Sequence, residues 1–411
     1  MSPNLLIEDT SRRHQSLGVV SATMLIGTAS MLVMGVQPIL LGGLVDAARI
    51  SEAGVGQAAM IEIFALAVGA TAGPFLMNRG DMRANVAAAS LLLVLVNLLI
   101  HWASGPAVLL QRGLAGLLEG LLLGAVSAIF THNDRPERMS GLLLGLSTIP
   151  QVIAAYLLPI VVIPRFGVDA GFAILAGAAM LSCLAAPAIV VRVPRQRGGH
   201  GDQIAVPKAL LAIAAAAFLQ NAGIGAAWSY MERLATQHHF EASVVGAAIA
   251  GSLAFQVGGA LLASWLGWRL PSRLVLILGA LLEAGLVVGL VQADHAATFI
   301  ASAWGFGLFW LALQPFLVTA VITLEPSRTA AMLLAPLALV GFSAGPLAAS
   351  LAIRPGHLEG GFWIAAALLV VAAALYALAG LMPSTESTSH RQGPRHSGGG
   401  KASAQILKSD L

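Results

Sequence analysis

The stretch Gly171-Phe172-Ala173-Ile174 returns 190 residues later as Gly361-Phe362-Trp363-Ile364. The same offset relates further landmarks without a gap over more than 100 residues. They are Val55-Gly56 and Val245-Gly246, Gly69 and Gly259, Arg79 and Arg269, Arg83 and Arg273, and Pro136-Glu137-Arg138 and Pro326-Ser327-Arg328. A repeat of this length indicates that one unit of roughly 190 residues was duplicated in tandem. Two mostly apolar units in tandem are typical of membrane transporters built from two helical bundles.

The composition of the 411-residue chain is that of a membrane protein. Hydrophobic residues make up 57% and charged residues 10%, whereas a soluble domain carries about 25% charged residues. The formal net charge of +3 is small and spread out, and no nucleic-acid-binding signature accompanies it, so no nucleic-acid partner is expected. The single cysteine, Cys183, excludes an internal disulfide and argues against a cysteine-based metal site. We expect no cofactor, no metal and no catalytic residues.

Spanning helices need about 20 mostly apolar residues, and the chain contains twelve such stretches. They are 17–45, 55–77, 84–103, 106–130, 141–163, 168–191, 208–231, 243–266, 272–292, 296–324, 329–353 and 360–382. The sequence therefore predicts an all-α membrane protein with twelve transmembrane helices in two six-helix bundles, at 17–191 and 208–382. A cytoplasmic N-terminus (1–16), a basic cytoplasmic linker (192–207) and a polar, disordered cytoplasmic tail (383–411) complete the predicted organisation.

The distribution of basic residues predicts the orientation. Of the 22 Lys and Arg residues, one, Arg112, falls inside a span, and four fall on the side opposite the linker: Arg49, Arg165, Arg233 and Arg354. The other 17 lie on the linker side, which the positive-inside rule assigns to the cytoplasm. We therefore expect a multi-pass protein of a cytoplasmic (inner) membrane with both termini cytoplasmic.

Twelve spans, a 6+6 duplication and a basic linker resemble the major facilitator superfamily. That family carries a Gly…Asp-Arg-x-Gly-Arg-Arg loop between helices 2 and 3, repeated more weakly between helices 8 and 9. The two copies here read Gly73-Pro-Phe-Leu-Met-Asn78-Arg79-Gly80-Asp81-Met82-Arg83 and Leu266-Gly267-Trp268-Arg269-Leu270-Pro271-Ser272-Arg273. Both are degenerate, because Asn78 replaces the usual Asp and the first copy is about one residue short. The resemblance implies gating loops with a differently wired charge network, formed by Asn78, Arg79, Asp81, Arg83, Arg269 and Arg273.

A second motif lies on the predicted helix 4. Arg112-x-x-x-Gly116 resembles the Arg-x-x-x-Gly element of proton-coupled drug antiporters in the superfamily. The helix 5 pattern of those antiporters, a Gly-Pro followed by paired glycines, is absent, and only Ser147-Thr-Ile-Pro150-Gln151 stands nearby. The motifs are therefore closest in style to the twelve-helix proton-coupled exporters, but degenerate.

Four charged residues fall inside the predicted spans: Glu62, Arg112, Glu119 and Glu283. Each costs about 2.5–3.5 kcal/mol at mid-membrane, so it is expected to face a cavity or a partner. Arg112 and Glu119 are seven residues apart, nearly on one helix face. Glu119, midway along its span, is the expected proton carrier. Arg112 would stabilise Glu119, contact an anionic solute, or form a structural ion pair with Glu62, whereas a structural role is favoured for Glu283.

Polar and aromatic residues on other helices are candidates for a solute cavity. Gln37 is the only amide side chain on helix 1, which has no carboxylate between residues 17 and 45. We expect Tyr230 and Glu232 to anchor helix 7 at the outer membrane interface, and Pro315 to kink helix 10. Trp310 and Gln314 share one face, which either lines the cavity or packs against a neighbouring helix. The cavity candidates are Gln37, Gln220, Asn221, Trp228, Trp304, Trp310 and Gln314.

Glycines at intervals of four predict close helix packing. They are Gly116, Gly120 and Gly124 on helix 4, and Gly341 and Gly345 on helix 11.

These features predict a monomeric secondary transporter, embedded in a lipid bilayer, that moves a small organic solute by rocking its two bundles around a midplane site. Export in exchange for protons, with Glu119 as the protonatable group, is the favoured mechanism, although a facilitator or an exchanger remains open. The alternative is proton-coupled uptake of a small organic acid with Arg112 as its contact. A non-transporting sensor or an embedded enzyme is disfavoured, because the spans hold no nucleophile-base cluster and the chain offers no sensor domain.

Overall fold

The computed structural model describes residues 17–131, 136–189, 207–266, 269–325, 329–354 and 356–381. Their secondary structure is helical, with no named strand in these ranges. Twelve helical stretches in this part of the chain are long and apolar enough to cross a membrane, which confirms the predicted number. The predicted N-terminus, the tail and all but the last residue of the linker lie outside the described residues.

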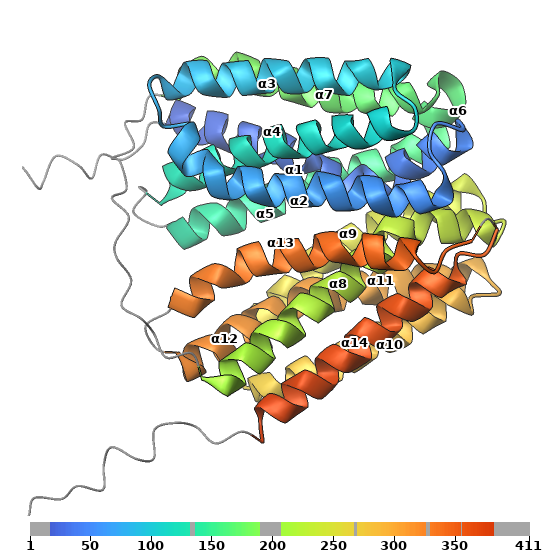
Figure 1. Ribbon diagram of the computed structural model, residues 1–411. Coiled ribbons are helices and arrows are strands. Elements are labelled where there is room, and N and C mark those ends of the chain that lie inside the picture. The colour runs from blue at the N-terminus through green and yellow to red at the C-terminus, as the bar shows by residue number, and fades with distance from the viewer. Residues whose placement is uncertain are drawn as a thin grey trace, which may run out of the picture.

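The first half comprises seven α-helices that form six spans (Figure 1). A π-helical turn, Leu158–Val162, joins α5 to α6, so that these two helices form one span. A 3-10 turn, Leu99–Trp102, extends α3. The helices are α1 (Leu17–Asp46), α2 (Glu52–Leu76), α3 (Met82–Leu98), α4 (Pro106–Phe130), α5 (Pro136–Leu157), α6 (Ile163–Phe166) and α7 (Val168–Ala185).

The second half repeats this plan. Its helices are α8 (Lys208–Gln237), α9 (Ala242–Leu266), α10 (Ser272–Val291), α11 (Ala296–Ala312), α12 (Gln314–Leu324), α13 (Thr329–Ser350) and α14 (Glu359–Ala379). One span is interrupted between α11 and α12, where Leu313 separates two helices just before Pro315. Proline removes a backbone donor and clashes with the preceding turn, so the predicted kink is confirmed.

The duplication predicted from the sequence is visible in the packing. A side chain added at Gly69 would meet the carbonyl of Leu117, and one at Gly259 would meet that of Leu308. Helix α2 therefore packs on α4 as α9 packs on α11. The two contacted residues, Leu117 of α4 and Leu308 of α11, are 191 residues apart rather than 190. The gapless offset predicted from the sequence is therefore wrong by one residue between α4 and α11.

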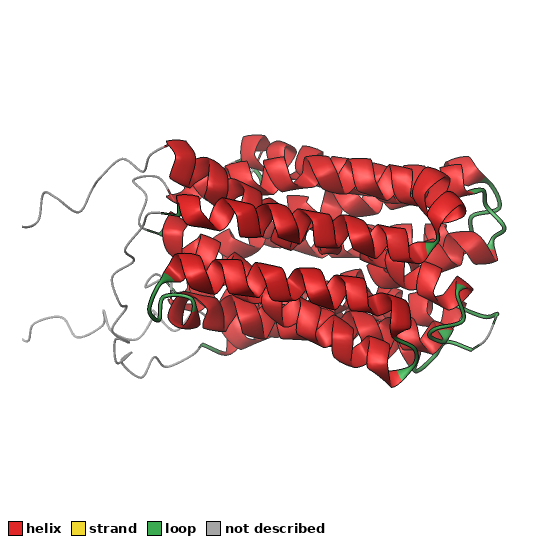
Figure 2. Ribbon diagram, turned by 90° about the horizontal axis from the view of Figure 1, so that it is seen from above, coloured by secondary structure: helices red, strands yellow, loops and turns green. Residues whose placement is uncertain are grey.

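The two halves meet along α1 and α8, α2 and α13, and α5 and α9. Gly56 of α2 lies against the carbonyl of Pro346, and Gly246 of α9 lies against that of Tyr156. These contacts gather where α1 and α8 end. We call this the outer end, because the distribution of basic residues predicts that it faces away from the cytoplasm. The opposite, basic end is where α1 and α8 begin, and Figure 1 shows the two helices diverging toward it. Figure 2 shows the same helices from above, running along the length of the molecule.

Candidate functional site

A buried polar network joins the first four spans. One guanidinium nitrogen of Arg112 donates to Glu62 Oε1 at 3.0 Å, and another donates to Asn97 Oδ1 at 2.8 Å. The second carboxylate oxygen of Glu62 accepts from Gln37 Nε2 at 2.8 Å. The guanidinium also lies over the ring of Phe172, 4.8 Å from its centroid. Arg112 and Glu62 are each 1% exposed, so the ion pair foreseen as a structural role is present and removed from solvent.

Glycines bring the helices of this network close enough to pair. A Cβ at Gly116 would overlap the carbonyl of Glu62, and one at Gly120 would overlap that of Leu66. Gly124 packs on Gly73 of α2 in the same manner. The packing role predicted for the glycines of α4 is therefore confirmed. Gly341 and Gly345 likewise pack on the backbone of α8.

Glu119 lies two turns further along α4 and is almost fully buried. It interacts electrostatically with both Glu62 and Arg112. No described residue donates a hydrogen bond to its Oε2 atom. Glu62 has both of its oxygens bonded, so the two acids differ in their hydrogen bonding.

The second half buries a different polar group. Gln220 Nε2 of α8 donates to Glu283 Oε2 of α10 at 2.9 Å, and Tyr376 of α14 donates its hydroxyl to Gln220 Oε1 at 2.8 Å. Gln220 and Glu283 are both buried, so Gln220 does not offer its amide to a solute in this conformation. The neighbouring Asn221 is also buried, and its amide bonds back to the carbonyl of Ala217.

The aromatic candidates separate into two places. Trp310 of α11 stacks on Phe342 of α13, with ring centroids 5.2 Å apart, and meets Trp228 of α8 edge-on at 5.5 Å. Trp228 is buried and donates its indole N–H across the halves to the carbonyl of Met34. Trp310 remains partly exposed.

Trp304 lies elsewhere on α11 and bonds to the carbonyl of Ala247, with its ring stacked on Phe255. Gln314 opens α12 and is partly exposed. Leu313 separates it from the helix that carries Trp310, and the predicted shared face of the two residues stays a prediction.

Ion pairs and hydrogen bonds join the two halves at the outer end. Arg233 of α8 donates to Asp46 of α1 at 2.6 Å and lies 3.9 Å from Glu52 of α2. Tyr230 accepts a hydrogen bond at 2.8 Å from the backbone N–H of Gly56.

The expected anchoring of Tyr230 and Glu232 at the membrane interface is wrong, because both are buried. Helix α8 continues to Gln237, past the predicted end at residue 231, and carries these side chains against the first half.

The basic-end loops bind within their own halves. Asp81 caps α3 by accepting from the backbone N–H of Arg83 at 3.0 Å. The side chain of Arg83 donates to the carbonyl of Ile189, and Arg273 donates to that of Gly380.

Two more residues of these loops, Arg79 and Arg269, also contact their own half. The carbonyl of Arg79 accepts from Asn85, and the guanidinium of Arg269 lies over the ring of Trp265. Asn78 has an interaction partner as well. The gating role of the six predicted loop residues stays a prediction.

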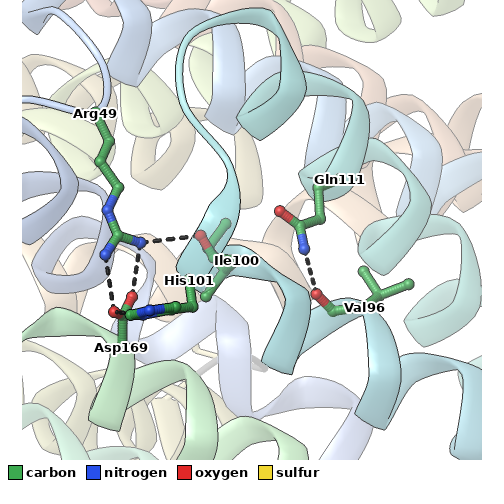
Figure 3. A network of polar contacts seen from close by, with 6 residues as sticks. All are labelled: Arg49, Val96, Ile100, His101, Gln111 and Asp169. Carbon is green, nitrogen blue, oxygen red and sulfur yellow. Dashed lines mark hydrogen bonds and ion pairs between the residues drawn. The ribbon is translucent and has the colours of Figure 1, made fainter.

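A further network fixes the outer end of the first half (Figure 3). Asp169 at the start of α7 receives two bonds from Arg49, of 2.7 and 2.8 Å, and contacts His101 Nδ1 at 2.7 Å. Arg49 also donates to the carbonyl of Ile100. In the second half Glu359, at the start of α14, accepts from the side chain of Gln237. Each acid therefore binds the segment at or just beyond the end of the first helix of its half.

Metal ligands do not gather in the described part of the chain: no three His, Cys, Asp or Glu side chains there could hold an ion together.

Solved structures share this fold. A bacterial homologue of the human lysosomal transporter Spinster, inward-facing and occupied, aligns over 89% of this chain and 96% of its own, with 17% identity and a TM-score of 0.64. The nucleoside transporter NupG, solved as a mutant, aligns over 88% of this chain and 99% of its own, with 12% identity and a TM-score of 0.72. No family model and no curated protein matches the sequence. The chain therefore has the fold of the major facilitator superfamily that its sequence resembles.

Proposed function

We propose that this protein is a secondary active transporter that moves a small organic solute by alternating access and exchanges it for protons. Its fold is that of solute transporters, in which two bundles rock around a site near the midplane. The contacts between the halves gather at the outer end, which supports a conformation closed on that side. We place it as a monomer in a cytoplasmic membrane, with its basic loops and both termini in the cytoplasm.

The hydrogen bonding of Glu119 carries the proposal of proton coupling. Glu62 has both oxygens satisfied, and its charge is offset by Arg112. Glu119 is buried beside this pair, and no described residue donates to its Oε2 atom. A buried carboxylate without donors costs several kcal/mol, whereas a neutral carboxyl costs far less. We therefore propose that Glu119 holds a proton in this conformation.

The repeat relates Glu119 to Trp310. Gly116 and Leu117 pack on α2 as Gly307 and Leu308 pack on α9, so Glu119 and Trp310 occupy equivalent mid-span positions. Trp310 is partly exposed and belongs to an aromatic group with Trp228 and Phe342. Such a surface favours a solute with a ring, which stacks on aromatic side chains. We propose that solute binds at Trp310 while the proton binds at Glu119.

The remaining cavity candidates have different standing in this proposal. Gln37 and Gln220 are each bonded to a buried glutamate, so they support the acids rather than the solute. Asn221 and Gln314 remain candidates for widening the site around Trp310, whereas Trp304 lies elsewhere on α11 and stays a separate prediction. Uptake of an organic acid would use Arg112, but its guanidinium is 1% exposed and already bonded to Glu62 and Asn97. Export is the direction we propose.

The proposal is tested by proton exchange in purified, detergent-solubilised protein. Candidate ring-containing solutes are added to weakly buffered wild type and Glu119→Gln, and proton release is followed with a pH indicator. Wild type is expected to release protons on binding, whereas Glu119→Gln binds solute without release. Glu241→Gln, which changes an exposed acid immediately before the second half's α9, is the matched control and should behave as wild type.

Two outcomes overturn parts of this proposal. Solute binding without proton release in wild type would exclude coupling and leave a facilitator or an exchanger. Proton release that persists in Glu119→Gln would move the proton to another group. Transport by reconstituted vesicles under an imposed pH gradient then gives the direction of coupling. Exchange for protons predicts that an inside-acid gradient drives solute accumulation, whereas proton-coupled uptake predicts accumulation under an inside-alkaline gradient.

A further inference from the structure

A carboxyl group lies in the seam between the two halves. Glu232 of α8 points at α1, and its Oε2 atom occupies the space that a side chain at Gly42 would fill. The residue is 8% exposed. Its Oε1 atom accepts from the Thr236 hydroxyl at 3.0 Å, but no described residue donates to Oε2. Glu232 is therefore a buried acid with one bonded oxygen, held at the contact that closes the outer end.

The charges around Glu232 are unbalanced. Arg233, beside it on α8, attracts its negative charge, and Asp46 on α1 repels it. Arg233 already donates to Asp46 at 2.6 Å and lies 3.9 Å from Glu52 on α2. Glu359 at the start of α14 is engaged by Gln237. The carboxyl groups of Asp46, Glu52 and Glu232 thus share the guanidinium of Arg233 in the closed seam. Among the described residues, Glu232 is the one of the three without its own ion pair.

Opening the outer end changes the environment of Glu232 more than that of Asp46. Asp46 has a side chain that is 61% exposed even when the seam is closed, so it is hydrated in either state. Glu232 loses its contact with Gly42 when α8 separates from α1, and water then reaches its carboxylate. Burial disfavours the charged form of an acid and hydration favours it, so the closed and open seams differ in how they bind a proton.

We propose that Glu232 is a proton-binding site that couples its protonation to the closure of the outer end. The protonated acid fits the closed seam against Gly42, and the carboxylate favours separation of α1 and α8. The sign follows directly: the closed state binds the proton more tightly, so a rise in pH opens the outer end. This inference rests on the alternating access of the proposed function, but it concerns a different acid from Glu119, on the other half of the protein.

The test measures the width of the outer end against pH. Spin labels are attached at Ser104→Cys and Ala297→Cys, two exposed positions on opposite halves, in a Cys183→Ala background without solute. A single coupled proton changes the closed-to-open ratio by up to about tenfold per pH unit. We expect the long-distance population to rise with pH in wild type and to stay low in Glu232→Gln, which mimics the neutral acid.

Matched variants make the outcome specific. Glu241→Gln should keep the wild-type pH response, because Glu241 is exposed at the same end. Thr236→Val removes the one hydroxyl bonded to the Glu232 side chain and should shift the opening midpoint to higher pH. It provides a second reading if Glu232→Gln does not fold. A wild-type distance that ignores pH, or a Glu232→Gln response equal to that of wild type, overturns the proposal.

The measurement also separates this inference from the proposed function. Glu119→Gln should abolish solute-dependent proton release yet keep the pH response of the outer end. A protein that opens with pH but releases no proton on solute binding would retain the Glu232 site and lose the exchange mechanism.

Discussion

The two halves of the molecule bury different side chains at equivalent places. Four residues of the first half, all buried, form its ion-pair network, and their counterparts in the second half are small or apolar and equally buried. The pairs are Gln37 and Ala227, Glu62 and Ser252, Asn97 and Val287, and Arg112 and Ala303. The reverse also holds, because Gln220, Glu283 and Tyr376 correspond to the buried residues Ser30, Leu93 and Ala186.

The comparison shows that the close packing of the helices does not depend on the buried polar residues. Helix α2 approaches α4 through Gly69 and Gly116, and α9 approaches α11 through Gly259 and Gly307. The second half makes this approach with Ser252 and Ala303 where the first half has its ion pair. The ion pair is therefore not needed for the helices to pack, and its distinguishing effect is the charge that it places beside Glu119.

The largest expected effect follows from breaking the ion pair on one side. Arg112→Ala leaves Glu62 buried and unpaired, which costs about 3–5 kcal/mol in unfolding free energy. The double variant Glu62→Ser with Arg112→Ala gives the first half the residues of the second and should recover most of this loss. Denaturant unfolding in detergent measures both. A double variant as unstable as the single one would show that the ion pair itself is required for packing.

The close helix contacts should respond alike in both halves. Gly116→Ala places a Cβ on the carbonyl of Glu62, and Gly307→Ala places one on that of Ser252. Overpacking of this kind costs about 1–3 kcal/mol. Gly258→Ala and Gly285→Ala, which have open space around the added atom, are the controls. If unfolding shows that one half tolerates the change, the two packing arrangements are not equivalent.

We expect the hydrogen-bonded group of the second half, Gln220, Glu283 and Tyr376, to contribute less to the free energy of unfolding than the ion pair. Tyr376→Phe removes the hydroxyl that donates to Gln220 and leaves no charge unpaired, so we expect a loss of about 1 kcal/mol. Tyr156→Phe, at a side chain that is about half exposed, is the control in the same unfolding assay. A loss as large as that of Arg112→Ala would mean that this hydrogen-bonded group contributes as much to stability as the ion pair.

The smallest effect is expected at the outer ends. Asp169→Asn weakens a partly exposed ion pair with Arg49, worth up to about 1 kcal/mol and reduced by salt. Glu359→Gln changes the equivalent acid, which is engaged by Gln237, so its effect should not depend on salt. Thermal unfolding at low and high ionic strength compares the two, and equal salt dependence would contradict the distinction.

The sequence was sufficient for the architecture because the repeat, the apolar lengths and proline are visible without knowing which helices pack together. Twelve stretches of suitable length gave the spans, and Pro315 marked the break before α12. The helix ends were harder to predict where charges are buried. Glu232 and Arg233 look like the end of an apolar run, but they lie inside the seam, so α8 continues to Gln237.

The partners within the sites depend on how each helix is rotated against its neighbours. Glu62 and Arg112 could be paired from their similar depth, because buried charges need an opposite charge nearby. Asn97 and Tyr376 each stand in an apolar stretch, with no signal that they face Arg112 or Gln220. Three glutamates, Glu119, Glu232 and Glu283, differ from Glu62 because each has an oxygen to which no described residue donates, a property that only the three-dimensional arrangement reveals.

The contacts of Gly56 with Pro346 and of Gly246 with Tyr156 have a geometric consequence. Each residue in one contact is the repeat counterpart of a residue in the other, so the seam has the form of an isologous interface between two identical subunits. A homodimer of six-helix chains would meet in this way. The fused protein keeps that symmetry in its backbone, while its equivalent mid-span positions carry an acid at Glu119 and an indole at Trp310. Fusion thus allows what a symmetric dimer forbids: different side chains at equivalent places on the two sides of one axis.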